Sequence, residues 1–497
     1  MEKLSKELIT CQTNSSNLPE RILQFGEGNF LRGFVDWMVH KLNQQGLFNG
    51  RIVAVQPTPH GKTVPSLNAQ NGLYTVVLRG IQNGCKVDER EVISSISRGI
   101  NPYEQWDKVL EVASKEEIQL VFSNTTEAGM KYLREDYNEA QSPLSFPGKL
   151  TACLYHRFKI LHGAPEAGWT IIPCELVENN GSLLRQTILQ IAQDWNLPED
   201  FTGWVVEHNR FCNTLVDRIV TGYPKDNIEQ FRQELGYDDE LLTIGEPYHL
   251  FVIDGDPIIR DVIPFQKAGL NVRWDDVDHF RKLKVRILNG AHTLMCLAGY
   301  LSGEKTVLGM MENPKARAFI TNGIYDEILP TLTINEAEKE SFASSVLERF
   351  QNPYTQHYLL DISLQSVSKF KTRLLPTLHD YTEKFGKEPR NIAYSLAALI
   401  VFYKGEHFEE NQLIGTFGGQ EYQVRDDEET IRFIYQTWCE AKNIEDVVQT
   451  IMENEKLWGC NMNKYPGLKE QVSNDVAHIN TNGVNFDLLL NESNGKL

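Results

Sequence analysis

Near the start of the chain, the spacing of hydrophobic residues changes from that of a strand to that of a helix and back again. Arg21–Phe25 is a short apolar run typical of a strand, and Phe34–Gly46 has the spacing of an amphipathic helix that ends at glycine. Arg51–Pro57 is a continuous β-branched run closed by proline, as expected for a strand buried on both faces of a parallel sheet. The order strand, helix, strand predicts the opening of a dinucleotide-binding fold.

Two later strands are each followed by small polar residues. Ile118–Gly129 and Gly168–Gly181 begin as apolar strands and break into polar loops, and open parallel sheets bind ligands at that end of their strands. Tyr248–Pro257 has the pattern of a late strand and turn, whereas a helical period prevails after about Trp274. We therefore predict an α/β protein with a Rossmann-type dinucleotide-binding domain over residues 1–275 and a mainly α-helical substrate and catalytic domain over residues 276–497.

Length and charge narrow the class of protein. The 497 residues suffice for two domains, and 49 Lys and Arg against 67 Asp and Glu give a net charge of -18. Such a charge disfavours nucleic acid or an anionic membrane as a partner. The longest apolar run, Ile392–Tyr403, is too short to cross a bilayer, and the amino-terminal segment resembles no secretory signal. We expect a cytoplasmic protein, in which a small anionic substrate needs a local basic pocket.

The cysteines argue against a metal or disulfide framework. Eight are scattered along the chain without a CxxC pair, and no HExxH motif occurs. Free thiols in a reducing compartment fit this pattern better than disulfides or structural zinc. We therefore expect no metal site.

A glycine pair marks a possible nucleotide site. In the segment QFGEGNFLRGF, Gly26 and Gly28 follow the first strand and precede the first helix, where backbone N–H groups can bind a pyrophosphate. The third glycine of a GxGxxG motif would fall at Leu31, and the second strand ends at Gln56 instead of the usual ribose-binding carboxylate. A dinucleotide site and a plain structural turn both remain open on these residues.

A second group of polar residues lies in the segment KVRILNGAHT. In an α-helix, Asn289 falls about 140° and His292 about 80° from Lys284, so the three share one side. Apolar residues frame the lysine on this count, and burial of this kind lowers a lysine pKa. Lys284 is then a candidate general acid and base, Asn289 could stabilise an alkoxide, and His292 could orient a substrate. The alternative is a lysine that reaches solvent, a helix break at Asn289 and a histidine of the core.

Two other polar places fit the same chemistry. Asn180 follows a strand in the segment CELVENNG, and Lys369 and Arg373 belong to the basic segment SKFKTRLLP. The basic segment is the kind of local cluster that an acidic protein needs to bind a carboxylate. A solvated helix face explains that cluster equally well.

Taken together, these segments resemble one family. The chain is similar to the long-chain mannitol dehydrogenase family of polyol and sugar-acid dehydrogenases, and most of all to its tagaturonate-reducing members. The resemblance covers nearly the whole chain and rests on segments in the family's order, namely QFGEGNFLRGFVDW, VFSNTTEAG, IIPCELVENNG, FCNTLVDRIVTGYP, KVRILNGAHT, RFQNPY, KFKTRLLP and LAALIVFY.

The resemblance implies a zinc-independent hydride transfer that uses NAD. It assigns proton transfer to Lys284, alkoxide stabilisation to Asn180 and Asn289, and substrate orientation to His292. Substrate contacts correspond to Asp217, Lys369 and Arg373. Cofactor contacts are expected at Gly26, Glu27, Gly28, Asn29, Phe30, Leu31, Arg32, Gln56, Asn124 and Thr125.

The expected reaction is the reversible reduction of the keto-hexuronate tagaturonate to altronate. A fructuronate reductase or a mannitol 2-dehydrogenase of the same family is the alternative, and a nucleotide-binding module without chemistry is a third possibility. The chain departs from polyol-oxidising relatives at Glu175 and Leu176, where those relatives carry Asp-Asn. No oligomeric state follows from the sequence.

Overall fold

The computed structural model describes residues 1–8, 17–256, 258–410 and 412–490. The chain divides into two compact units: Met1–Gly80 with Lys86–Phe280 form unit 1, and Ile81–Cys85 with Arg281–Leu497 form unit 2. The division falls within helix α10 (Val277–Leu283), shortly after the predicted boundary at residues 275 and 276. The assignment of Ile81–Cys85 to unit 2 has no counterpart in the sequence prediction.

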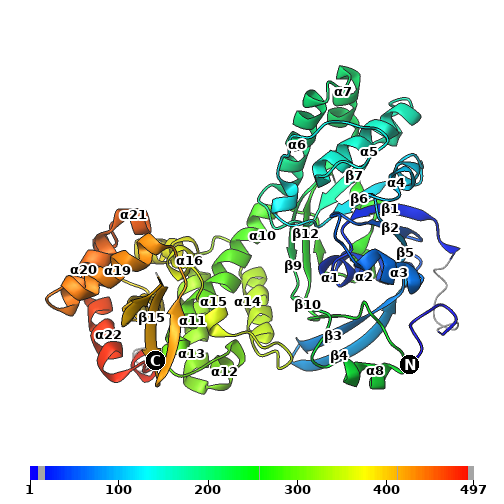
Figure 1. Ribbon diagram of the computed structural model, residues 1–497. Coiled ribbons are helices and arrows are strands. Elements are labelled where there is room, and N and C mark those ends of the chain that lie inside the picture. Colours follow the sequence, from blue (N-terminus) through cyan, green and yellow to red (C-terminus); the bar gives the residue numbers. More distant parts are fainter. Residues whose placement is uncertain (9–16, 257, 411, 491–497) are drawn as a thin grey trace. The chain divides into compact units, whose positions relative to one another are not determined.

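Unit 1 is built on a six-stranded sheet in which all neighbouring strands are parallel. The strand order is β5 (Ile96–Ile100), β2 (Arg51–Val55), β1 (Glu20–Phe25), β6 (Leu120–Ser123), β7 (Thr170–Pro173), β8 (Arg210–Phe211). Counted along the chain within this sheet, the order is 3-2-1-4-5-6, which is that of a doubly wound dinucleotide-binding fold. The predicted fold class is confirmed (Figure 1).

Both faces of this sheet are buried, because helices cover each of them. Strand β1 shows the alternation: Ile22 belongs to the core on one face, whereas Leu23 and Phe25 belong to the core on the other. The continuous apolar run of each strand therefore follows from burial on two sides. The helices of unit 1 are α1 (Asn29–Arg32), α2 (Val35–Gln44), α3 (Thr63–Ala69), α4 (Trp106–Ala113), α5 (Phe146–Ile160), α6 (Asn180–Asp194), α7 (Glu199–His208), α8 (Ile228–Leu235) and α9 (Ile259–Val262).

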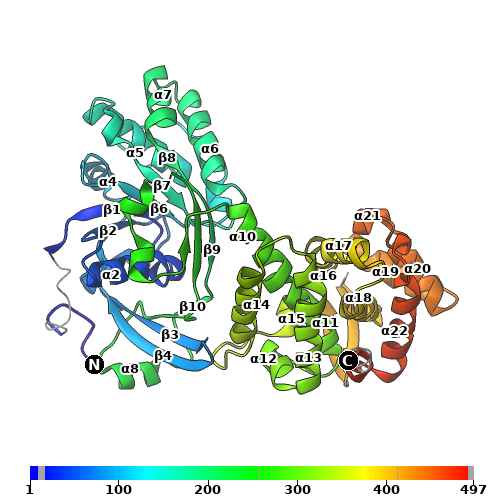
Figure 2. The same cartoon turned by 180° about the vertical axis from the view of Figure 1, so that it is seen from behind.

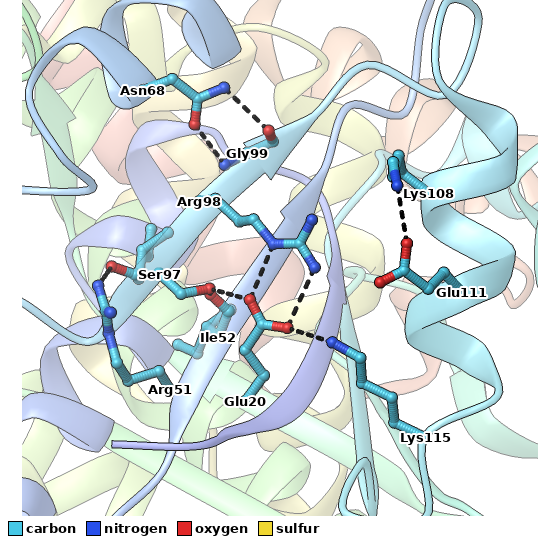
Figure 3. Close-up of polar contacts among 11 residues, drawn as sticks. Glu20, Arg51, Ile52, Asn68, Ser97, Arg98, Gly99, Lys108, Glu111 and Lys115 are labelled. Atoms are coloured by element: carbon cyan, nitrogen blue, oxygen red, sulfur yellow. Dashed lines mark hydrogen bonds and ion pairs between the residues drawn. The ribbon is translucent and has the colours of Figure 1, made fainter. Parts of the chain in front are cut away.

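The amino-terminal end of β1 is anchored by an ionic cluster (Figure 3). Arg98 and Ser97 of β5 and Lys115 all donate to the Glu20 carboxylate, with Arg98 Nε at 2.8 Å. Burial raises the pKa of Glu20, but these donors outweigh it and bring the value down to about 2. The cluster holds the end of the sheet that lies opposite the ligand-binding edge.

Two smaller sheets complete unit 1. One has the order β10 (Val220–Gly222), β11 (Thr243–Gly245), β3 (Tyr74–Gln82), β4 (Cys85–Ile93), and the other has the order β13 (Val272–Arg273), β12 (Leu250–Asp254), β9 (Asn213–Asp217). The predicted late strand at Tyr248–Pro257 is β12, which pairs antiparallel with β9. It therefore does not extend the main sheet.

Unit 2 is mainly helical, as predicted (Figure 2). Its interior contains α11 and α18, and the apolar run at Ile392–Tyr403 is confirmed as a core helix because nearly all of α18 is buried. The helices of unit 2 are η5, a π-helix (Lys284–Asn289), α11 (Gly290–Leu301), α12 (Val307–Glu312), α13 (Pro314–Asn322), η6, a second π-helix (Gly323–Ile328), α14 (Glu336–Phe350), α15 (Leu359–Ile362), α16 (Ser366–Arg373), α17 (Leu375–Phe385), α18 (Arg390–Phe402), α19 (Glu428–Glu440), α20 (Ile444–Glu453), α21 (Glu455–Trp458), α22 (Leu468–Asn482) and α23 (Asp487–Leu490).

Unit 2 also contains a small sheet that the sequence analysis did not predict. Strands β14 (His407–Glu409), β15 (Gln412–Phe417) and β16 (Gln420–Val424) are antiparallel. Gly418 and Gly419 form the two-residue turn between β15 and β16, with φ of 57° and 77°. A Gly-Gly pair between two alternating runs is a hairpin signal, so the local sequence does contain the information.

The remaining general expectations concern cysteines and membrane helices. The seven cysteines that the structure describes are free thiols, four of them buried, whereas Cys11 lies outside the described residues. Within the same part of the chain, no helix is long and apolar enough to span a bilayer.

The amino terminus of α18 is capped by a carboxylate from another helix. Pro389 at the N-cap position offers no side-chain acceptor, and Glu327 of η6 accepts instead from Asn391 N at 2.6 Å and from Ile392 N at 3.0 Å. Glu327 is 3% exposed, and burial raises its pKa to about 7. Helix α18 therefore begins where Glu327 supplies the acceptors that the sequence around Pro389 lacks.

We predict that Glu327→Ala lowers the free energy of unfolding by about 2 kcal/mol, since it leaves two buried N–H groups without an acceptor. Urea unfolding followed by circular dichroism measures the change. The exposed Glu340 is the control, and Glu340→Ala should stay within about 0.5 kcal/mol of the parent. Equal stability of the two variants would contradict the capping role.

Candidate active site

The turn after β1 can be made only by glycine at its first position. Gly26 has φ of +119°, and a Cβ built there would lie 2.8 Å from the Asn124 carbonyl oxygen of the loop after β6. Gln24 Nε2 donates to the Gly26 oxygen at 2.9 Å and holds the turn from below. The turn therefore approaches the neighbouring strand's loop more closely than any side chain allows.

The second glycine leaves open space above the turn. Gly28 is the N-cap of α1 with φ of -72° and ψ of 170°, and a Cβ there would meet nothing within 4 Å. Gly28 and Asn29 are both exposed. A turn whose backbone is exposed at a helix amino terminus, at the point where the order of the sheet reverses, fits a pyrophosphate.

The missing third glycine has a structural explanation. Leu31 is buried, and its Cδ1 would lie 3.2 Å from a Cβ at Gly26, so it packs into the turn. The close approach falls two residues later, at Gly33, where a Cβ would lie 3.1 Å from Val220 and 3.3 Å from Thr243. The segment GEGNFLRG thus contains a packing glycine at a different spacing from GxGxxG.

The structure places Arg32 beneath the turn. Its guanidinium donates to the Glu27 carbonyl, to Asn29 Oδ1 at 2.7 Å and to Thr243 Oγ1 at 3.2 Å, and only 3% of the residue is exposed. A direct contact between Arg32 and the cofactor would require the guanidinium to leave these partners. Glu27 is also buried, and burial raises the pKa of its carboxyl to about 7.

The remaining cofactor candidates of unit 1 differ in accessibility. Phe30 is half-buried and stacks on Phe34. Gln56 is 1% exposed and donates to the Thr58 oxygen at 2.7 Å, so its amide folds back into its own loop. Asn124, half-buried, donates to the Cys174 oxygen at 2.9 Å, and the backbone N–H of Thr125 donates to Glu175. The structure thus brings the glycine turn and the loop after β6 together.

Asn180, the predicted alkoxide-binding residue of unit 1, is fully buried. Its Nδ2 donates to Pro173 O, Glu175 O and Thr214 Oγ1 at 3.2, 3.0 and 2.9 Å, and its Oδ1 accepts from Thr214 N at 2.9 Å. The amide ties β7 to β9. Asp217 ends β9 and is 5% exposed. Both residues belong to unit 1, whereas the other predicted catalytic and substrate residues belong to unit 2.

In unit 2 the segment that contains Lys284 and Asn289 is a π-helix. The angular count above assumed an α-helix, but in a π-helix the hydrogen bonds run from i to i+5, so Asn289 lies one turn along from Lys284. Gly290 has φ of -60° and ψ of -49°, and α11 continues from it. The alternative of a helix break at Asn289 is therefore wrong. Lys284 is half-buried, and less enclosed than the count predicted.

His292 is surrounded by other basic groups. Burial lowers its pKa well below 6.5, and His357, Arg349, Arg373 and Lys369 lower it further. Its ring lies 4.9 Å from that of His357, and its Nε2 is a buried atom with no hydrogen-bond partner among the described residues. His292 is therefore neutral, and its buried ring nitrogen Nε2 is left without a hydrogen-bond partner among the described residues.

Helix α16 supplies the predicted basic cluster. Lys369 Nζ donates to the Ile362 oxygen at 2.8 Å, and Arg373 Nη1 lies 3.4 Å from Thr293 Oγ1, next to His292. Burial lowers the pKa of both groups, and Arg373 lowers that of Lys369 further. The structure thus brings Lys369 and Arg373 to the side of α11 that carries His292, and the solvated-face alternative does not describe them.

Sequence reasoning missed two members of this cluster, His357 and Arg349. Arg349 lies in the segment RFQNPY, which was used for the resemblance without a role for its residues. A histidine next to an Asn-Pro segment gives no local signal of a contact with His292, because the two are far apart in the chain. Among the described residues, no three His, Cys, Asp or Glu side chains gather in a group that could hold a metal ion.

Family models cover most of the chain. Residues 20–266 match the mannitol dehydrogenase Rossmann domain, and residues 276–480 match the mannitol dehydrogenase C-terminal domain. The chain belongs to the mannitol dehydrogenase family. The resemblance noted in the sequence is confirmed.

Relatives of known name extend over the full chain. An altronate oxidoreductase of Halalkalibacterium halodurans is 48% identical, with 97% of this chain and 96% of that protein covered. Altronate oxidoreductases of Bacillus subtilis and Escherichia coli are 43% and 41% identical, with 97% and 94% of this chain and 97% and 95% of those proteins covered. The similarity therefore includes both units.

Solved structures of two other dehydrogenases share the fold. D-sorbitol dehydrogenase in substrate-free form has a TM-score of 0.78 at 21% identity and covers 97% of this chain and 99% of its own. Pseudomonas fluorescens mannitol 2-dehydrogenase, in a ternary complex with NAD and D-mannitol, has a TM-score of 0.66 at 21% identity and covers 99% and 100%. At this identity the likeness is one of fold.

Substitutions at the two glycines of the turn should affect stability and cofactor binding separately. We predict that Gly26→Ala destabilises the protein without any ligand, because it places a Cβ against the Asn124 carbonyl at a positive φ. Gly28→Ala should leave thermal unfolding of the free protein nearly unchanged, yet weaken NADH binding at least several-fold, because its methyl group enters the open space. Differential scanning fluorimetry and NADH titration measure both effects. Normal NADH affinity in Gly28→Ala would place the cofactor elsewhere.

The neutral state of His292 predicts a pH dependence of stability. Its pKa in the folded unit is well below 6.5, so as the pH falls the unfolded chain takes up this proton first. The stabilising contribution is present above pH 6.5 and is lost as the pH falls below it. Between pH 7.5 and 5.5 the group accounts for about 1 kcal/mol of lost stability.

His292→Gln should remove that part of the acid sensitivity. Urea unfolding at the two pH values measures the difference for the parent and the variant. His407→Gln, at an exposed histidine of β14, is the matched control and should behave like the parent. The same loss in His292→Gln as in the parent would mean that His292 is not held neutral.

Proposed function

We propose that the protein is an NAD-linked, zinc-independent oxidoreductase that reduces tagaturonate to altronate and catalyses the reverse oxidation. The observation that carries the proposal is the end-to-end similarity, at 41 to 48% identity, to proteins named altronate oxidoreductase. The glycine turn of unit 1 and the lysine, asparagine and histidine of unit 2 supply the groups that this chemistry needs. The substrate is a small sugar acid, and we place the reaction in the cytoplasm, in hexuronate breakdown.

The nucleotide fits the turn after β1. The turn at Gly26 and Gly28, whose backbone is exposed at Gly28, would hold the pyrophosphate, and Asn124 and Thr125 would border it from the loop after β6. Bound NADH supplies the hydride for the ketone carbon. Arg32 and Gln56 are buried, so they would support the site indirectly. Arg32 would hold the turn from beneath, and Gln56 would hold its own loop.

The proton comes from the protein. As the carbonyl carbon accepts the hydride, its oxygen gains negative charge, and Lys284 donates a proton to it, so that ketone, hydride and proton give the secondary alcohol. Asn289 would donate an N–H to that oxygen, and neutral His292 would bind a neighbouring hydroxyl through its ring nitrogen. The resemblance also assigns Asn180 to the oxygen, which requires its amide to exchange one present hydrogen bond for the substrate.

The carboxylate explains the basic cluster. Lys369 and Arg373 are cations whose pKa is lowered by burial, so each gains when an anion approaches. Asp217 would accept from a substrate hydroxyl. A polyol such as mannitol offers no charge to this cluster, and the named relatives likewise do not favour mannitol 2-dehydrogenase or fructuronate reductase. A nucleotide-binding module without chemistry would leave Lys284, Asn289 and His292 without a task.

Initial rates with tagaturonate, fructuronate and fructose, each with NADH and with NADPH, test substrate and cofactor together. We predict the highest kcat/KM for tagaturonate with NADH. Fructose should be the poorest of the three because it lacks the carboxylate. A preference for fructuronate or fructose would reject the substrate assignment, and NADH binding without turnover of any ketone would favour the binding module.

Lys284→Met tests the proton donor at nearly constant side-chain volume. We predict a fall in kcat of about 10² to 10⁴, the usual contribution of a general acid, with an unchanged Kd for NADH. Lys282→Met, at an exposed lysine two residues away, is the matched control and should keep parental rates. Near-normal turnover by a folded Lys284→Met variant would remove lysine from the mechanism.

A further inference from the structure

We infer that Glu175 is a positioning residue for the cofactor: its buried carboxyl holds the loop after β6 in the shape that borders the glycine turn. We call Ser123–Thr126 the β6 loop. The inference rests on the proposed function, because it takes that turn and loop as the nucleotide site. It adds a residue to which the sequence analysis gave no role.

The carboxyl of Glu175 accepts hydrogen bonds from the β6 loop. Oε2 accepts from Ser123 Oγ at 2.9 Å, and Oε1 accepts from Thr125 N at 3.0 Å and from Thr125 Oγ1 at 3.1 Å. Glu175 is 3% exposed and follows β7, the strand next to β6. Burial raises the pKa of this carboxyl, and the hydrogen bonds from the loop oppose the rise. A buried acidic group thus stands where an apolar side chain would be easier to bury.

We call the hydrogen bonds from Ser123 and Thr125 to the Glu175 carboxyl the clamp. The residue that follows it in the chain has a strained backbone. Thr126 has φ of +91°, a region that β-branched residues avoid. Gly129 closes the other side of the loop: its N–H donates to the Thr126 oxygen at 3.1 Å, and a Cβ there would lie 2.6 Å from Thr125 Oγ1. Hydrogen bonds on one side and close packing on the other therefore enforce a conformation that the threonine itself disfavours.

The β6 loop packs directly against the glycine turn. Asn124 N donates to Phe25 O at 3.0 Å, and the Asn124 carbonyl oxygen is the atom that excludes a side chain at Gly26. A shift of the β6 loop would therefore move the turn against which the pyrophosphate is expected to bind. For stability alone, glycine at position 126 would serve better. The presence of both the hydrogen bonds to Glu175 and a strained threonine at this edge indicates that the loop's shape serves ligand binding.

Three variants separate positioning from stability. Glu175→Gln keeps an acceptor for both donors of Thr125 and offers its NH₂ to the Ser123 hydroxyl, so we expect parental NADH affinity. Glu175→Ala removes the clamp, and we expect the Kd for NADH to rise tenfold or more. In Thr126→Gly, relief of strain should keep or raise the unfolding temperature of the free protein, while the loosened loop weakens NADH binding several-fold. Fluorescence titration and scanning fluorimetry provide the two measurements.

The outcomes are distinct from failure of the proposed function. Glu117→Ala, at an exposed glutamate near the amino end of β6, is the control and should bind NADH like the parent. If the parent binds no NADH, the proposed function itself fails. If the parent binds NADH and Thr126→Gly binds it equally well, the positioning role is overturned. Lower stability with unchanged Kd in folded Glu175→Ala would likewise assign the clamp to stability alone.

Discussion

The approach of the turn after β1 to the loop after β6 is the constraint on which unit 1 depends. The two strands are neighbours at the point where the order of the sheet reverses, which is where open parallel sheets bind ligands. The approach is so close that the Asn124 carbonyl leaves room for a hydrogen atom but not for a Cβ at Gly26. Arg32 below the turn and Glu175 beside the loop are both buried charged residues that hold backbone groups of these two segments.

Unit 2 gathers several basic groups around His292, although the chain as a whole is acidic. Burial lowers the pKa of His292 well below 6.5, and His357, Arg349, Arg373 and Lys369 lower it further, so His292 stays neutral. Cations held close together lose stability through repulsion and burial, and attraction to an anionic substrate would offset that loss. The features that disfavour the cluster in the free protein are those that would favour a carboxylate.

Sequence reasoning succeeded where one local signal decided the structure. The strand, turn and helix at Glu20–Gln44 follow from periodicity and glycine, and the long apolar run of α18 could only be a core helix. It failed where partners came from distant segments. The saturated hydrogen bonds of Asn180 depend on β9, and the contact of His357 with His292 depends on packing. The π-helix at Lys284–Asn289 changed the geometry of a segment that was predicted to be helical, because the count presumed an α-helical period.

The fold itself does not decide the substrate. D-sorbitol dehydrogenase and mannitol 2-dehydrogenase share it over nearly the whole chain at 21% identity, although their names refer to uncharged polyols. Selectivity must therefore depend on side chains and not on the backbone fold alone. In this chain the basic groups around His292 are the candidates for binding a carboxylate, since a polyol gives them nothing to neutralise. Helix α16 and residues 352–358 carry three of them, so these are the elements at which an acidic substrate would be distinguished from a neutral one.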